Sequence, residues 1–256
     1  MTRPVGRNIA ISPFRRLVID LMHFSQKVPS VTVERRMDLA ELVAARQACL
    51  TRPTWYALFT KAFAIVAART PELRRSYLRY PWPHLYEHPR NLATLNLERT
   101  FGGEKIVIYA LIRGPENRTL EELDAIVRWH KHEPLENIGS FQRAIRLGRL
   151  PFPIRRLVWW VSLNFFGRLR CHNYGTFGVT STAGIGAGIQ RIIPILTSTI
   201  HYGLFDAAGS LDMRLSFDHR VLDGATAAQA LVDLESVLKR EILDEVRSLP
   251  AARLAA

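Results

Sequence analysis

The clearest alternation of apolar and polar positions runs through residues 211–218. Every second position there is apolar, at Leu211, Met213, Leu215 and Phe217. This period of two predicts a strand with one buried face that ends near His219. After Asp223 the apolar residues change to helical spacing in an alanine-rich stretch, at Ala228, Leu231, Val232 and Leu238. The pattern predicts a strand, a turn that carries His219 and Asp223, and then a helix.

The same two periods organise much of the rest of the chain. Helical spacing predicts helices over residues 14–25, 39–50 and 55–69. Alternation and β-branched residues predict strands over residues 30–37, 91–97, 105–111 and 195–202. Asp38 and Thr54 are placed to cap the second and third helices, and Thr119 opens a capping box with Glu122. Both strands and helices are therefore predicted along the chain.

Composition fits one intracellular domain. The chain has 256 residues, 48% of them hydrophobic, and no low-complexity linker divides it. Its two cysteines, Cys49 and Cys171, form no disulfide framework and no metal-ligand cluster, which suits a reducing compartment. The amino terminus lacks an apolar core of signal-peptide length, so we expect a cytoplasmic protein without a metal site.

His219 is the first candidate for chemistry. An imidazole exchanges a proton near neutral pH, and a turn after a rigid strand holds a side chain in place while leaving it open to a substrate. A lone histidine near a strand end is nevertheless more often a surface or core residue, and an Asp-Gly pair is an ordinary turn signal. The surrounding motif decides between these interpretations.

The string Ser216–Ala225, SFDHRVLDGA, closely resembles the DHRxxDGA signature of the catalytic domain of the 2-oxoacid dehydrogenase dihydrolipoamide acyltransferases. That domain shares its fold with chloramphenicol acetyltransferase. The resemblance implies a two-layer α/β sandwich, in which helices cover a mixed sheet. It also implies that His219 is the general base of acyl transfer and that Asp223 helps to hold the structure of the active site.

A second motif lies at Asn173-x-Gly175-x-Phe177-Gly178, which is similar to the NxGxFG stretch of the same family. In the family this stretch follows a strand that carries a serine or threonine just before the asparagine, and that hydroxyl donates a hydrogen bond to the oxyanion. His172 occupies the position here. His172 can replace the donor, a hydroxyl of Thr176, Thr180 or Ser181 can reach the site instead, or transfer has been lost.

The resemblance extends from near the first residues to about Val246. It implies an amino-terminal arm at residues 1–13, a catalytic domain at 14–246 and a tail at 247–256. No room remains for lipoyl or subunit-binding domains, so we expect a free-standing member that carries no covalent lipoyl group and acts on coenzyme A thioesters. In the family the active site lies between the subunits of a trimer. We therefore expect a homotrimer, with larger assemblies left open.

The net charge of +12 calls for an explanation. The arginines are scattered and no nucleic-acid-binding signature accompanies them, so we do not expect a nucleic-acid partner. Part of the positive charge would bind the phosphates of coenzyme A, and more of it would bind an acidic membrane surface. Most single arginines are simply solvated.

Residues 151–170 are the least ordinary stretch. Arginines flank an apolar run that contains Trp159, Trp160, Phe165 and Phe166. The run is shorter than the roughly 20 apolar residues that span a bilayer. It suits peripheral contact with an anionic membrane, but we favour a helix buried at a subunit contact, because interfaces also select aromatic residues and arginine.

Two hypotheses from different classes follow. The favoured one is a coenzyme A-dependent acyltransferase that moves an acyl group from a thioester to a thiol, hydroxyl or amine acceptor, with His219 as base. The alternative is a catalytically impaired scaffold or membrane-associated binding protein that retains the fold, suggested by His172 and residues 151–170. No esterase elbow, P-loop or dinucleotide-binding glycine motif competes with them.

Overall fold

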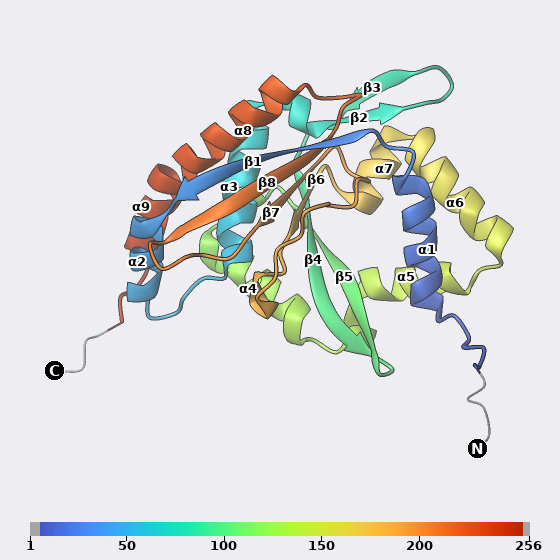
Figure 1. Cartoon of the computed structure of the whole chain (residues 1–256), viewed down its shortest axis with the longest axis horizontal. Coiled ribbons are helices and arrows are strands. Elements are labelled where there is room, and N and C mark those ends of the chain that lie inside the picture. Colours follow the sequence, from blue (N-terminus) through green and yellow to red (C-terminus); the bar gives the residue numbers. More distant parts are fainter. Residues whose placement is uncertain (1–5, 253–256) are drawn as a thin grey trace.

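A six-stranded mixed sheet forms the centre of the molecule. The computed structural model describes residues 6–252, except for the side chain of Ile185 (Figure 1). The strand order is β1-β8-β7-β6-β4-β5. The strands are β1 (Ser30–Asp38), β4 (Leu92–Phe101), β5 (Glu104–Arg113), β6 (Phe177–Thr180), β7 (Ser198–Tyr202) and β8 (Ser210–Asp218). β6 runs parallel to β4 and β7, and the other neighbouring pairs are antiparallel.

Helices cover one face of the sheet and gather beside β4 and β5 (Figure 1). The covering helices are α3 (Trp55–Arg69), α4 (Leu120–His132) and α8 (Gly224–Val237). The second group consists of α1 (Pro13–Ser25), α5 (Gly139–Arg149), α6 (Phe152–Asn164) and α7 (Gly167–Tyr174). The short α2 (Ala40–Ala48) and α9 (Leu243–Ser248) pack together, and a small hairpin of β2 (Arg75–Leu78) and β3 (His84–Glu87) stands apart from the main sheet.

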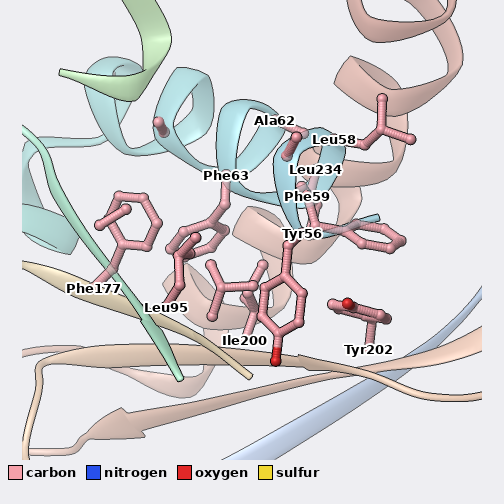
Figure 2. Close-up of a cluster of buried hydrophobic side chains, with 14 of the residues drawn as sticks. Tyr56, Leu58, Phe59, Ala62, Phe63, Leu95, Phe177, Ile200, Tyr202 and Leu234 are labelled. Carbon is pink, nitrogen blue, oxygen red and sulfur yellow. The ribbon is translucent and has the colours of Figure 1, made fainter. Parts of the chain in front are cut away.

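The main core lies between α3 and the sheet (Figure 2). Phe63 of α3 packs edge-on against Phe177 of β6 with 5.0 Å between ring centroids, and Phe59 stacks on Tyr202 of β7 at 4.6 Å. α3 is buried on nearly all sides because α4 and α8 pack against it on the same face of the sheet. The core thus fixes β6, β7 and β8 relative to one another.

The periods of the sequence predicted most of these elements correctly. The predicted strand after Ser30, the hairpin of β4 and β5, and the strand that ends before His219 are all present. Thr54 and Thr119 cap their helices as predicted, and the Thr119 capping box is complete. Asp38 accepts a hydrogen bond from the Ala40 amide at 3.1 Å, although Leu39 is the residue at the helix boundary.

The predicted domain limits remain a prediction. Among the described residues, the first helix begins at Pro13 and the last ends at Ser248, and Ala251 pairs with Cys49 through an isolated bridge. Residues 1–5 of the predicted arm and 253–256 of the predicted tail lie outside the described residues. Between these limits, no helix combines the length and apolar character that crossing a membrane requires.

Candidate active site

The turn after β8 is held by a buried ion pair. Asp218 is fully buried, and its two carboxylate oxygens accept hydrogen bonds from the Arg220 guanidinium at 2.9 and 2.7 Å. The backbone N–H of Arg220 also donates to this carboxylate, at 3.0 Å. Arg220 in turn lies over the ring of Tyr77 on β2, 4.4 Å from its centroid. The residues on both sides of His219 are therefore fixed.

His219 itself reaches solvent from this fixed turn. Its backbone N–H donates to the carbonyl of Pro29 at 2.9 Å, which ties the turn to the start of β1, while its side chain is 46% exposed. The ring centroids of Phe217 and His219 are 5.5 Å apart. A rigid backbone that carries an open imidazole is the arrangement that a general base needs.

Asp223 stands beside His219 without bonding to it. Its Oδ1 atom is 3.9 Å from Nδ1 of His219, beyond hydrogen-bond range, and its side chain is 87% exposed. Asp223 occupies the N-cap position of α8, but its carboxylate accepts no capping hydrogen bond. Within a single chain, the carboxylate that holds the turn by hydrogen bonds is that of Asp218, a residue whose partner the sequence left open.

His172 lies away from the turn that carries His219. It is exposed on α7 and accepts a hydrogen bond from Arg113, at the end of β5, with 3.4 Å between Nη2 and Nδ1. Four strand spacings separate β5 from β8, which corresponds to about 19 Å. His172 and His219 thus lie at the same end of the sheet but do not meet within one chain.

The prediction of a strand before Asn173 is wrong. Residues 167–174 form α7, and β6 begins only at Phe177, after Gly175 takes a left-handed φ of 90°. A Cβ at Gly175 would come within 2.2 Å of the Thr94 hydroxyl, so the close approach of α7 to β4 requires glycine. The strand of this motif therefore follows the asparagine.

The three hydroxyls named as alternatives differ in what they contact. Thr176 is buried and bonds to the backbone of Leu92, and Ser181 donates to the carbonyl of Tyr202 at 2.9 Å. Thr180 is half-buried at the end of β6, where its backbone pairs with β7, and its hydroxyl has no hydrogen-bond partner within the described part of the chain. Because the neighbouring Val179 points into the core, Thr180 points to the opposite face of the sheet.

A small pocket of about 80 Å³ opens next to the turn. Four of its lining residues are cationic, and none is acidic: Lys27, Arg79, Arg170 and Arg220. Arg170 is buried and donates to the carbonyls of Tyr77, Leu163 and Ile195 rather than to a carboxylate. Burial lowers the pKa of Arg170, and the charge of Asp218 opposes this shift. The pocket suits an anionic group.

Comparison with known proteins rests on structure alone. No protein-family model matches the sequence, and no curated protein matches it. Among solved structures, a probable dihydrolipoamide acetyltransferase from Listeria monocytogenes 4b F2365 superposes with a TM-score of 0.66 at 17% identity, covering 97% of this chain and 99% of that one. The dihydrolipoamide acetyltransferase of Azotobacter vinelandii gives 0.63 at 19% identity, covering 95% and 99%.

This chain has the fold of a dihydrolipoamide acyltransferase catalytic domain. Chloramphenicol acetyltransferase also matches, with a TM-score of 0.51 at 12% identity over 90% of this chain and 98% of that one. The predicted fold class, a chloramphenicol acetyltransferase-like sandwich with a mixed sheet, is thereby confirmed. In the Azotobacter protein, a serine, a histidine and an asparagine four residues after that histidine were investigated for roles in catalysis. His219 and Asp223 have the same spacing of four.

Proposed function

We propose that this protein is a coenzyme A-dependent acyltransferase with His219 as its general base. The observation that carries the proposal is the exposed imidazole on a turn fixed by the Asp218–Arg220 ion pair, within the dihydrolipoamide acyltransferase fold. The acceptor is a thiol, a hydroxyl or an amine.

In the proposed reaction, His219 removes the proton from the acceptor as the acceptor attacks the carbonyl carbon of the acyl thioester. A tetrahedral intermediate forms, and its negative oxygen needs a hydrogen-bond donor. When the intermediate collapses, the carbon–sulfur bond breaks and the imidazolium returns its proton to the departing thiolate. The acyl group ends on the acceptor, coenzyme A leaves as a thiol, and His219 is neutral again.

The donor to that oxygen comes from a neighbouring chain in the proposed homotrimer. Thr180 is the favoured donor because its hydroxyl is free and faces away from the helical core, where a second chain can approach it. His172 remains the other candidate, since it is exposed at the same end of the sheet as His219. Removing such a donor typically lowers the rate about 100- to 1000-fold.

The cationic pocket supports an anionic donor substrate. Arg220 joins the two features, because it lines the pocket and directly follows His219. Coenzyme A carries several phosphate groups, and Lys27 and Arg79 offer charged donors to such a group, whereas Arg220 and Arg170 are already bonded to Asp218 and to backbone carbonyls. At about 80 Å³ the pocket has room for one phosphate group rather than for the whole molecule.

Thiol release from a panel of acyl-coenzyme A donors tests the proposal. The wild-type protein should release coenzyme A in the presence of an acceptor, and His219→Ala should lower that rate about 100- to 10,000-fold. His132→Ala is the matched control, because His132 is also exposed but lies on α4. Equal rates for His219→Ala and the wild type would exclude His219 as the base.

A non-catalytic, membrane-associated protein is the second candidate function. The exposed apolar side chains on α6 favour it, with Leu157 and Ile154 at least half exposed. No turnover with any donor, together with retained binding to lipid, would support this function over acyl transfer.

A further inference from the structure

Helix α6 is packed with its charge inside and its aliphatic side chains outside. Arg155 is buried and pairs with the fully buried Asp20 of α1, which also binds Arg156. Trp159 continues the buried side and stacks on Phe24 of α1. A surface helix normally shows the reverse arrangement, because burying apolar area is what holds it to the protein.

The outer side of α6 carries an apolar stripe. Ile154, Leu157 and Val158 are 50%, 56% and 42% exposed, and Val161 is half-buried. These four residues, which we call the α6 apolar face, have the i, i+3, i+4, i+7 spacing of a single helix side. Exposed aromatic side chains flank them, at Phe152, Trp160 and Phe166. Contiguous exposed apolar surface of this kind marks a place of interaction.

The surroundings of this face are basic. Arg149, the last residue of α5, lies three residues before α6, Arg168 lies in α7 four residues after α6 ends, and both are exposed. No aspartate or glutamate occurs between Glu136 and Asp206 in the sequence. The acidic residue that contacts α6, Asp20, is already neutralised by two arginines. The α6 apolar face is therefore bordered by positive charge at both ends.

We propose that the α6 apolar face binds to an anionic lipid surface, with α6 lying along that surface. Aliphatic residues enter the acyl boundary, aromatic side chains lie at the headgroup level, and Arg149 and Arg168 contact lipid phosphates. At 13 residues α6 is about 20 Å long, too short to span a bilayer. A symmetric contact with a second copy fits this face less well, because it would bring Arg149 and Arg168 of both copies together.

Co-sedimentation with vesicles tests the proposal. The full chain should bind vesicles of phosphatidylcholine containing phosphatidylserine and should bind vesicles of phosphatidylcholine alone much more weakly. Leu157→Glu should lower the partition coefficient at least about tenfold. Val232→Glu is the matched control, because Val232 is a 40% exposed helical residue on α8. Circular dichroism and thermal unfolding establish that both variants are folded.

The charge contribution is tested separately. Removing Arg149 and Arg168 together, each as Arg→Gln, should weaken binding about fivefold for each arginine at low salt. The same pair of changes at the exposed Arg52 and Arg240, which lie far from α6 in the sequence, should leave binding unchanged.

A contact measurement covers the case in which Leu157→Glu fails to fold. Brominated lipids should quench the tryptophan fluorescence of the wild type, and Trp160→Phe should remove a large part of that quenching. No binding to anionic vesicles, or equal binding by Leu157→Glu and Val232→Glu, would overturn the proposal. The proposal would also be overturned if Leu157→Glu dissociates an oligomer while neither the wild type nor the variant binds vesicles. The α6 apolar face would then be a subunit contact.

Discussion

Asp218 fixes the turn that carries His219. Its carboxylate is removed from water, bound on both oxygens by Arg220, and bonded to a backbone amide of the turn. Buried carboxylates of this kind are stable only while their partners remain in place. The position of the imidazole therefore depends on the Asp218–Arg220 ion pair beside it.

Replacing Asp218 with asparagine should destabilise the protein by about 2 kcal/mol, because two charge-assisted hydrogen bonds are weakened while Arg220 stays half-buried. Urea unfolding measures this loss. Asp212→Asn is the control, since Asp212 is exposed and its contact with Arg36 is long at 3.7 Å; its effect should stay below about 0.5 kcal/mol. Equal effects would show that the buried pair does not hold the turn.

The buried His201 should lower the free energy of unfolding in mild acid. It is buried on β7, its Nδ1 atom has no partner within the described residues, and burial followed by the charge of Arg214 lowers its pKa below 6.5. On acidification the unfolded chain takes up a proton at this imidazole before the folded chain does. The free energy of unfolding should therefore fall as the pH drops from about 7 to about 5.

The His201 contribution is measured by urea unfolding across that pH range. In His201→Gln the fall in stability should be shallower than in the wild type, because one group with a lowered pKa has been removed. His132→Gln, on the exposed surface of α4, should keep the wild-type slope. If His201→Gln also keeps that slope, His201 is not responsible for the acid sensitivity.

At the residue scale, the sequence predicted His219 on a turn because strand and helix periods bracket it. It did not predict the partner of Asp218, because a carboxylate next to an arginine can bind any nearby guanidinium until the fold is known. The resemblance to the NxGxFG motif placed the family's oxyanion donor at the position of His172, with Thr176, Thr180 and Ser181 as alternatives. The sequence could not rank these three hydroxyls, because the contacts that engage Thr176 and Ser181 and leave the Thr180 hydroxyl unbonded within the described residues depend on the fold.

At the element scale, α6 shows what helical spacing alone cannot determine. The sequence predicted an apolar segment with arginines around it, but spacing does not say which side of a helix is buried. The side is set by Asp20, which lies 135 residues before Arg155 and offers a carboxylate inside the protein. An ion pair between such distant residues is not visible in a local pattern.

Asp20→Asn should destabilise the protein by about 3 to 5 kcal/mol, because it leaves Arg155 buried without an opposite charge. Thermal or urea unfolding measures the change. Asp206→Asn is the matched control, since Asp206 also pairs with an arginine but both partners are largely exposed, and its effect should stay below about 1 kcal/mol. A comparable loss in both variants would argue against a special role for the buried pair.

At the scale of the whole molecule, His219 and the candidate donors are separated across one sheet, so the proposed site is shared between chains. β8 carries His219, whereas β6 carries Thr180 and α7 carries His172. Sedimentation should show a homotrimer under assay conditions. A stable monomer with full activity would contradict a site shared between chains.

Subunit mixing provides a sharper measurement. His219→Ala and Thr180→Ala should each be poorly active alone, and a mixture that exchanges subunits should recover up to about a quarter of the wild-type rate, because some interfaces then combine two intact residues. The parallel mixture of His219→Ala with His172→Ala distinguishes the two donors. No recovery in either mixture, despite subunit exchange, would place all reacting groups within one chain.

Trp160 borders both the outside of α6 and the cationic pocket next to Arg220. With α6 lying on a bilayer, the mouth of that pocket would sit level with the lipid headgroups. A substrate with a long acyl tail could then reach His219 by lateral diffusion, without crossing water. Turnover of such a substrate would follow its mole fraction in the leaflet rather than its bulk concentration, and diluting it with inert lipid would slow the protein at constant total substrate.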